Sequence, residues 1–381
     1  MRLSRRIEAV EASRTVRFTA LIERLRSGGR DIVNFAVGEP EFPTPDAIVA
    51  ATQAALARGE TRYGPVAGMA RLRSAVAESF AGWGPENILI ANGSKQILYG
   101  LFQVLLDPGD EVILPNPHWV SFSQQIRLAG ACPVMVDTHR HQLDRRAIAA
   151  AVTPRTRAIL VNSPNNPTGA VYPPQDLAWI ADLARERDLW IIADEAYAFF
   201  VYDNLDHHSL FAYEAIRDRL IVVRSFSKSF SMTGFRVGYG AGPEPLIRAL
   251  GKLQSHLTGN VCTFAQHGAL AAMDLDPTVV QKWRGELAEK RDIAHEYAAR
   301  LFTCVRPQGA FYLFPDISAR LQKGETAEDF AAALLEKTGV AVVPGEAFGA
   351  QNHIRISYAV PKETLVEGFE RMEKALLEAE G

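Results

Sequence analysis

The sequence has few cysteines, no long apolar run and no excess of charge of one sign. Its three cysteines, Cys132, Cys262 and Cys304, are scattered, and none forms a Cys-x-x-Cys pair. This spacing favours free thiols in a reducing cytoplasm over a disulfide framework. No apolar run is long enough to span a membrane, and the amphipathic residues after Arg5-Arg6 do not resemble a signal peptide. We therefore expect a cytoplasmic protein.

Positive and negative charges are nearly balanced along the chain. There are 41 Lys and Arg residues against 44 Asp and Glu residues, which gives a formal net charge of −3. The sequence contains neither a basic stripe nor an acidic tail, so we expect neither nucleic acid nor a membrane as the main partner.

The length of the chain predicts two domains, because 381 residues exceed the size at which a single core stops growing. In the middle of the chain, unbroken apolar runs alternate with helical periods such as 177–187. Such runs are typical of strands buried on both faces of a mostly parallel sheet, and the alternation indicates repeated βαβ units. The expected strands are 88–91, 111–114, 133–136, 158–161, 190–193 and 220–223, with a helix over 95–106.

The pattern changes after about residue 275. A long charged helical region over 280–301 is followed by short apolar strands and two further helices, which is typical of a smaller α+β domain. We expect a large domain over 41–275 and a small domain that combines 1–40 with 276–381. The expected strands of the small domain lie at 310–313, 340–343 and 354–356, and its other helices at 327–337 and 363–377.

Residues that directly follow the strands are the first candidates for a site, because open parallel sheets bind ligands beyond the carboxyl ends of their strands. Asn92-Gly93-Ser94-Lys95 follows the strand 88–91 and opens a helix. The free N–H groups and the dipole of a helix start suit a phosphate. Ser94 is also an ordinary N-cap residue, so both interpretations stay open here.

Two further strand ends present amide and carboxylate groups. Asn162 to Gly169 is a run of eight turn-type residues with two prolines, which presents asparagine side chains unless it is a plain Asn-Pro turn. Asp194 closes the strand 190–193, where a buried carboxylate is costly without a cationic or N–H partner. A protonated pyridine nitrogen would be such a partner, and a solvated aspartate is the other interpretation.

A lysine among small hydroxyl residues follows the strand 220–223. In Ser225-Phe226-Ser227-Lys228, the amine could attack a carbonyl while the hydroxyls and the downstream Arg236 hold a phosphate. A surface lysine beside serines is the alternative. Arg355 lies within the apolar strand 354–356, where its forked donors suit a substrate carboxylate or a structural salt bridge. Together the strand ends supply an amine, an acid, phosphate donors and an arginine for a carboxylate.

Two other chemistries find little support in the sequence. Gly238 to Gly242 is similar to a dinucleotide-binding loop, but Pro243 occupies the position that the third glycine requires. The pairs His139/His141 and His207/His208 lack the context of a metal site, so we expect loop histidines and no metal.

The combined motifs resemble the class I aminotransferases of pyridoxal-phosphate fold type I, particularly their aspartate aminotransferase branch. The resemblance runs from Gly38-Glu39-Pro40 to Arg355. It implies a three-layer α/β fold with a mostly parallel sheet in the large domain and a smaller α+β domain. It further implies pyridoxal 5'-phosphate as cofactor, and a transaminase that moves the amino group of an L-amino acid to a 2-oxo acid by a ping-pong mechanism.

The same resemblance implies a role for each matching residue. Lys228 would carry the cofactor, Asp194 would pair with its pyridine nitrogen and Tyr197 would bind its ring oxygen, so these three are the expected catalytic residues. The implied cofactor-binding residues are Tyr63, Gly93, Ser94, Lys95, Trp119, Asn166, Asp194, Tyr197, Ser225, Ser227, Lys228 and Arg236. The implied substrate-binding residues are Gly38, Trp119, Asn166 and Arg355. Tyr63 would reach the cofactor phosphate of the neighbouring subunit, which implies a homodimer with active sites at the interface.

The sequence does not determine which amino acid and 2-oxo acid are the substrates. His118 stands where relatives often carry tyrosine, and Ala198 where an acidic residue is common; both are expected near the pocket. Aspartate with 2-oxoglutarate is the expected substrate pair, and aromatic, branched or specialised amino acids remain alternatives. The fold could also support β-elimination or a non-catalytic sensor, although a sensor's added DNA-binding domain has no room before residue 30.

Overall fold

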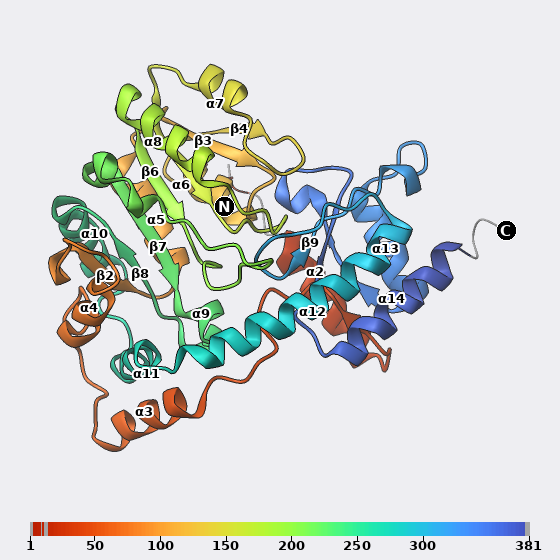
Figure 1. Ribbon diagram of the computed structural model, residues 1–381, viewed down its shortest axis with the longest axis horizontal. Coiled ribbons are helices and arrows are strands. Elements are labelled where there is room, and N and C mark those ends of the chain that lie inside the picture. The colour runs from red at the N-terminus through yellow and green to blue at the C-terminus, as the bar shows by residue number, and fades with distance from the viewer. Residues whose placement is uncertain (1–2, 9, 11–13, 378–381) are drawn as a thin grey trace.

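The computed structural model describes residues 3–8, 10 and 14–377, which form two parts built on different hydrophobic cores (Figure 1). The larger part contains a seven-stranded sheet with helices on both faces, and the smaller part contains short strands and three of the longer helices. This confirms the predicted three-layer α/β fold. The predicted small domain also includes residues 1–2, 9, 11–13 and 378–381, which lie outside the described residues.

The central sheet has the strand order β2-β8-β7-β6-β5-β3-β4. All neighbouring pairs are parallel except the two pairs that β8 makes with β2 and β7. The strands are β2 (Ile88–Ala91), β3 (Glu111–Asn116), β4 (Cys132–Asp137), β5 (Thr156–Asn162), β6 (Trp190–Asp194), β7 (Leu220–Ser225) and β8 (Gly238–Ala241). Six of these were predicted, with ends that differ by at most two residues.

Successive residues of each central strand enter different cores, because side chains alternate between the faces of a sheet. On β6, for example, Ile191 packs in the core under α8, and Ile192 packs in the core under α5. The helices of the first face are α3 (Asp46–Ala57), α4 (Ala70–Ala77), α7 (Arg145–Ala151), α8 (Pro174–Arg187) and α11 (Thr263–Met273). Those of the second face are α5 (Ser94–Leu105), α6 (Val120–Leu128) and α10 (Glu244–Leu257). The prediction of strands buried on both faces is confirmed.

Strand β8 was not predicted, and its residues had been weighed as a dinucleotide loop. Gly238-Tyr239-Gly240-Ala241 has low strand propensity, so its place depends on tertiary contacts. A Cβ atom at Gly238 would lie 2.5 Å from the Ser94 backbone nitrogen and 2.8 Å from the Gly93 carbonyl carbon. Only glycine therefore allows β8 to pass directly beneath the start of α5.

The smaller part joins the two ends of the described chain. β1 (Val33–Asn34) pairs in parallel with β10 (Val340–Ala341), and β11 (Val343–Pro344), β12 (Ile354–Ser357) and β9 (Tyr312–Leu313) form a three-stranded sheet. Its helices are α1 (Arg5–Glu8), α2 (Arg14–Ser27), α12 (Pro277–Leu301), α13 (Ala327–Thr338) and α14 (Lys362–Leu377). The predicted strand 340–343 is split at Val342, and the predicted strand 310–313 is shorter than expected.

Short helical turns complete the structure. They are α9 (Phe226–Ser229), η1 (Pro85–Asn87), η2 (Leu210–Ala212), η3 (Glu214–Arg219), η4 (Thr233–Phe235), η5 (Ser318–Arg320) and η6 (Gly345–Phe348). Helix α12 runs from the larger part to the smaller one in Figure 1, and its side chains enter both cores: Val280 the first, Trp283 and Leu287 the second. The domain limits at 40/41 and 275/276 stay a prediction.

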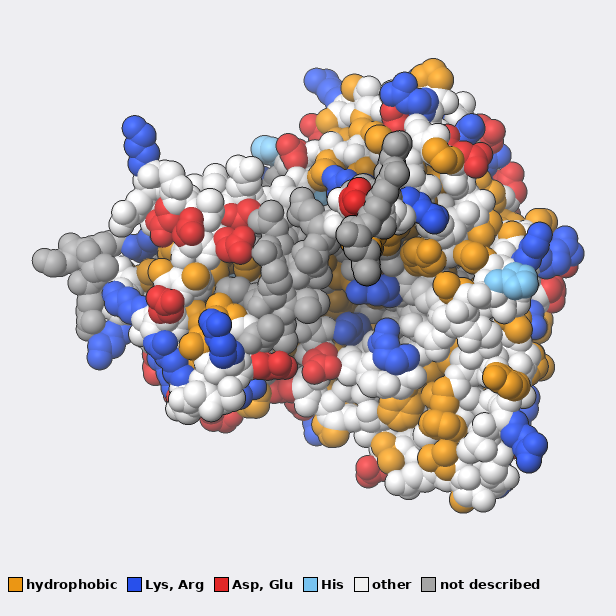
Figure 2. Space-filling model, turned by 180° about the vertical axis from the view of Figure 1, so that it is seen from behind, with side chains coloured by type: hydrophobic (Ala, Val, Ile, Leu, Met, Phe, Trp, Pro, Cys, Tyr) orange, Lys and Arg blue, Asp and Glu red, His pale blue; other side chains and the backbone are white. Residues whose placement is uncertain are grey.

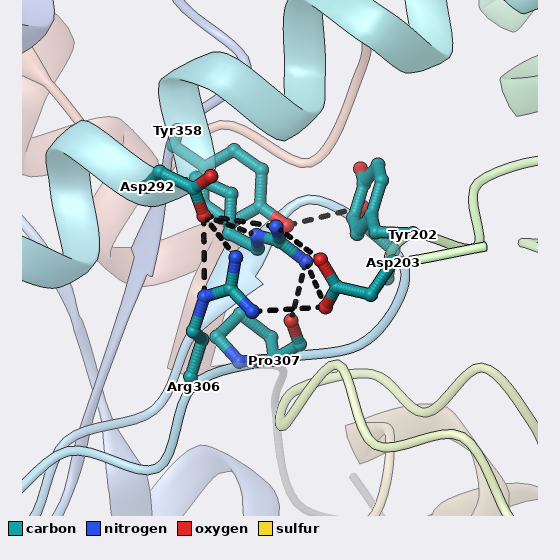
Figure 3. Close-up of polar contacts among 8 residues, drawn as sticks. Tyr202, Asp203, Asp292, Arg306, Pro307 and Tyr358 are labelled. Carbon is teal, nitrogen blue, oxygen red and sulfur yellow. Dashed lines mark hydrogen bonds and ion pairs between the residues drawn. The ribbon is translucent and has the colours of Figure 1, made fainter. Parts of the chain in front are cut away.

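A network of two arginines and two aspartates ties the parts together (Figure 3). Arg291 on α12 is 1% exposed and binds both carboxylate oxygens of Asp203, at 2.8 and 2.9 Å. Arg306 donates to the same Asp203 at 3.0 Å and to Asp292 at 2.7 Å. Asp203 belongs to the segment that follows β6, so the network fixes that segment against α12.

Charged side chains of both signs are interspersed over the face shown in Figure 2. No helix in the described part of the chain combines the length and the apolar character that crossing a membrane requires.

We expect Asp203→Ala to destabilise the fold by about 2–3 kcal/mol, because it removes a bidentate partner from a buried guanidinium. The free energy of unfolding from urea titration measures this effect. Asp218→Ala is the matched control: Asp218 pairs with Arg219 at 3.1 Å on the surface, where a pair contributes about 0–1 kcal/mol. Equal losses in both variants would show that the Asp203 network is not structurally important.

Candidate active site

Five segments that follow strands or open helices meet around one cavity at the carboxyl ends of the central strands. The cavity has a volume of about 120 Å³. Its lining residues are Ser94, Lys95, Trp119, Phe122, Asn162, Asn166, Asp194, Ala196, Tyr197, Ser225, Ser227, Lys228 and Arg236. Ten of the residues that the sequence predicted are among them, which supports the argument that strand ends mark the site.

Asp194 is the buried acid of the cavity. Its carboxylate is 3% exposed, and its Oδ1 atom accepts a hydrogen bond from the Ala196 amide at 3.0 Å. Burial raises the pKa of Asp194 to about 7, and the nearby Glu195 charge adds to this rise. A carboxylate in this state is suited to a cationic N–H partner supplied by a ligand, such as a pyridine nitrogen.

The adjacent Glu195 differs because it has partners within the protein. Arg224 donates to its Oε2 atom at 2.7 and 3.0 Å, and Ser209 donates to its Oε1 atom at 2.6 Å. Burial opposes ionisation, but Arg224 and His207 outweigh it and hold the pKa of Glu195 down to about 2. Of two consecutive buried carboxylates, only Asp194 is left for a ligand.

Lys228 is the amine of the cavity, and α9 holds it at the end of β7. Its Nζ atom donates to the Gly38 carbonyl at 2.5 Å, which brings the predicted Gly38 beside the site. Burial, together with the charges of Arg236, Arg355 and Lys95 and against the pull of Glu39, lowers the pKa of Lys228 to about 8. The amine can therefore lose its proton and act as a nucleophile or base near neutral pH.

The start of α5 and Arg236 form a compact anion-binding corner. Gly93 has φ +81°, and a Cβ atom there would lie 2.7 Å from Nη2 of Arg236, so the guanidinium packs directly against the glycine. Helix α5 begins at Ser94 with Gly93 as its N-cap residue, and no side chain caps it. The alternative of Ser94 as the N-cap is therefore wrong. The exposed helix start and the guanidinium together suit a phosphate.

The serines beside Lys228 contribute differently to this corner. Ser225 caps α9 by accepting a hydrogen bond from the Ser227 amide at 3.1 Å. Ser227 accepts from Nη1 of Arg236 at 3.4 Å. Both serines line the cavity, so their predicted contact with a phosphate stays a prediction.

Arg355 lies beside the cavity in an aromatic setting. Its guanidinium carbon is 4.4 Å from the centroid of the Tyr312 ring and 5.0 Å from that of Phe348. It donates to the Asn166 side-chain oxygen at 3.2 Å and to the Ala36 carbonyl at 3.1 Å, while its buried Nε atom has no partner. The polar partners found for Arg355 among the described residues are an amide oxygen and a backbone carbonyl, so a structural salt bridge to a carboxylate finds no support. An unpaired buried donor of this kind suits a carboxylate ligand.

Three residues that the sequence singled out do not line this cavity. Tyr63 is fully exposed, which accords with its expected place at the site of a neighbouring subunit, and that role stays a prediction. His118 is buried, its Nδ1 atom lies 3.1 Å from the Asn116 side-chain oxygen, and it does not line the cavity either. Ala198 lines a separate cavity instead. Each of the latter two is the direct sequence neighbour of a lining residue, Trp119 or Tyr197, so their expected influence on the pocket stays a prediction.

Several lining residues were missed from the sequence. Asn162 closes β5, accepts from the Asn166 amide at 3.0 Å and donates to the Asp194 carbonyl at 3.1 Å. It belongs to the turn that was singled out, so its position at the strand end was the available signal. No feature of the sequence around Phe122 or Ala196 indicated that these two residues would line the cavity. Within the described residues, no cluster of three or more His, Cys, Asp or Glu could hold a metal ion.

The residues present fit pyridoxal phosphate, the cofactor that the resemblance implies. The buried Asp194 suits the ring nitrogen, the Gly93–Arg236 corner suits the phosphate, Lys228 suits the aldehyde and Trp119 supplies an aromatic wall. The Nε atom of Arg355 adds a place for a substrate carboxylate.

Comparison with known proteins identifies the relatives of this chain. Residues 30–372 match the family described as aminotransferase class I and II. The chain is 41% identical to an aspartate aminotransferase of Streptomyces avermitilis, over 99% of this chain and 97% of the relative. It is 40% identical to an aspartate/prephenate aminotransferase of Thermus thermophilus, over 98% of each protein. The solved structure of the Thermus thermophilus aspartate aminotransferase with maleate superimposes with a TM-score of 0.94 at 40% identity, over 99% of this chain and 100% of that chain.

We expect the Lys228 amine to become reactive as the pH rises through about 8, because only its neutral form is a nucleophile. The protein without cofactor is treated with a small amine-modifying reagent at a series of pH values, and the modified fraction of Lys228 is measured by mass spectrometry. The exposed Lys252 is the internal reference for the reagent. A midpoint for Lys228 equal to or above that of Lys252 would contradict the lowered pKa.

Proposed function

Because the chain belongs to the class I and II aminotransferase family, we propose that it is a pyridoxal-phosphate enzyme that moves the amino group of L-aspartate to a 2-oxo acid. The chain is an aminotransferase. Its cofactor, its substrate and the roles of its residues are what we propose. One observation carries the proposal: an amine with a lowered pKa and a buried acid without a cationic partner line the same cavity.

The protein's own residues account for the steps around the cofactor. When bound, pyridoxal phosphate supplies an aldehyde for the amino group and a ring that accepts an electron pair. Asp194 would hold the proton on the ring nitrogen, and Asn166 and Tyr197 would bind the ring oxygen. Lys228 would hold the cofactor at its aldehyde in the resting enzyme and, as a neutral amine, would take the proton from the substrate Cα atom. The amino group leaves on a 2-oxo acid in a second half-reaction, so ping-pong kinetics are expected.

A dicarboxylate substrate accords with the positive charge around the cavity. Arg355 offers its unpaired Nε atom for the α-carboxylate, and Lys95 carries a second positive charge to the wall beside Trp119, at 4.8 Å from the ring centroid. The relatives are named for aspartate, and the Thermus thermophilus structure contains maleate, a four-carbon dicarboxylate. Aspartate is therefore the proposed amino donor.

We expect Lys228→Ala to lower kcat by at least about 10³-fold, because it removes both the nucleophile and the base. Its bound cofactor should also lack the visible absorbance of the lysine-bound form. Lys252→Ala is the control for loss of a lysine, and it should match the wild type in both measurements.

The same preparations test the substrate and the reaction. A panel of L-amino acids is added to the wild type, and the cofactor spectrum and the products are followed. Aspartate should convert the spectrum to that of the aminated cofactor with release of its 2-oxo acid. A response to no amino acid would refute the transamination, and release of pyruvate from cysteine conjugates would favour β-elimination instead.

We also propose a homodimer in which Tyr63 completes the cofactor site of the other subunit. Two observations support it: Tyr63 is 100% exposed in the single chain, and the apolar residues Leu56 and Leu257 are each 45% exposed. A large aromatic side chain in this state is typical of an interface. A cytoplasmic location is a proposal that rests on composition alone.

Hybrid dimers distinguish a partner's Tyr63 from the subunit's own. Tyr63→Ala alone should weaken cofactor binding by roughly tenfold, as expected for loss of one phosphate hydrogen bond. Mixed with Lys228→Ala subunits, each Tyr63→Ala subunit should receive an intact Tyr63 from its partner and regain wild-type affinity. A mixture that shows no such recovery, or a protein that sediments as a monomer, would contradict the shared site.

A further inference from the structure

Tyr312 is a buried tyrosine between the acid end and the carboxylate end of the site, and it does not line the cavity. It lies on β9 of the smaller part and is 0% exposed. Its hydroxyl is 3.0 Å from the hydroxyl of Tyr197, and its ring faces the guanidinium of Arg355 at 4.4 Å. One side chain therefore contacts two proposed active-site residues through two different groups.

These contacts close a ring of four side chains. Asn166 donates to the Tyr197 hydroxyl at 3.4 Å and accepts from Arg355 at 3.2 Å, so it joins the same two residues from the other side. All four members are at most 6% exposed. Two of them come from the larger part and two from the smaller, so the ring spans the two parts.

The directions of the hydrogen bonds among these four side chains follow from the role of Tyr197. If the Tyr197 hydroxyl donates its single proton to the ring oxygen of the cofactor, it can only accept from its protein neighbours. The Tyr312 hydroxyl must then donate to Tyr197. A donor that itself accepts a hydrogen bond is polarised and donates more strongly, so Tyr312 would strengthen the contact between Tyr197 and the cofactor.

The ring of Tyr312 has a separate effect on Arg355. It faces the guanidinium from β9, and the second aromatic face, that of Phe348, comes from η6. These contacts restrict the guanidinium without using its Nε donor, which has no protein partner. A buried cation–π contact is stronger than an exposed one and leaves the N–H groups free for a carboxylate.

From these contacts we propose that Tyr312 is a positioning residue with two separable effects: its hydroxyl orients Tyr197 toward the cofactor, and its ring orients Arg355 toward the substrate carboxylate. The inference rests on the proposed function. It assigns to the smaller part of the protein a direct influence on the cofactor end of the site.

Two substitutions separate the two effects. Tyr312→Phe removes the hydroxyl and keeps the ring, whereas Tyr312→Leu removes both. The readouts are the pH titration of the absorbance of the bound cofactor, and the dissociation constant of maleate, a dicarboxylate that cannot be transaminated. Tyr358→Phe is the matched control, since Tyr358 is equally buried in the same part and its hydroxyl contacts the Ala310 carbonyl, at 3.2 Å, and Tyr202 (Figure 3), rather than Tyr197.

Tyr312→Phe should raise the midpoint of the spectral titration by roughly half a pH unit. A weaker hydrogen bond from Tyr197 to the ring oxygen leaves more electron density on the nitrogen that joins Lys228 to the cofactor. That nitrogen then keeps its proton to higher pH. The dissociation constant of maleate should change less than about twofold, because the cation–π contact is retained. Tyr312→Leu should shift the titration equally and also weaken maleate binding by roughly tenfold.

The outcomes distinguish this inference from the proposed function. A wild type that binds no cofactor or shows no spectral titration would refute the proposed function. A normal wild-type titration that is unchanged in Tyr312→Phe would overturn the effect of the hydroxyl alone. Equal maleate affinities in the Phe and Leu variants would overturn the effect of the ring, and shifts as large in Tyr358→Phe would show that both effects are general consequences of core substitution.

Discussion

An excess of positive charge around one buried acid is the constraint on which the active site depends. Lys95, Lys228 and Arg236 line the cavity together with Asp194, and Arg355 lies beside it. The neighbouring glutamate does not reduce the excess, because its own arginine neutralises it. Burial opposes the charged forms of Lys228 and Asp194, so the site favours ligand groups of opposite charge beside them. A phosphate and a substrate carboxylate provide that compensation, and the ring nitrogen provides a cation for the acid.

The fold maintains this imbalance partly by pairing other charges of the same segment with one another. The segment after β6 carries Asp194 and Tyr197 and continues to Asp203, which the network of Arg291 and Arg306 fixes against α12. Within that network each arginine has a carboxylate partner, so it adds rigidity without adding net charge to the region. Among the described residues, Asp194 is left in the cavity without a cationic partner, which a ligand can supply.

The sequence predicted the sheet and most of the site because both follow local rules. Unbroken apolar runs marked six of the seven central strands, and polar residues that follow four of them proved to line one cavity. Strand β8 was not predicted, because its glycine-rich sequence has no apolar run. Glycine is required there by the close contact between β8 and the start of α5, and a local sequence pattern does not reveal such a contact. Tyr312 was missed for a similar reason: it looks like an ordinary core residue, and its contacts with Tyr197 and Arg355 exist only after the two parts have folded together.

The register of the small sheet decides whether these late contacts can form. On β12, Arg355 and Ser357 point to the same face because they are two residues apart, and Ser357 is paired with Tyr312 of β9. Tyr312 and Arg355 are therefore diagonal neighbours on one face, at the separation from which a long side chain and an aromatic ring meet. A slip of one residue between β9 and β12 would turn the arginine to the other face and separate it from both the ring and Asn166. The pairing of two short strands, one of them only two residues long, thus determines the geometry of the carboxylate end of the site.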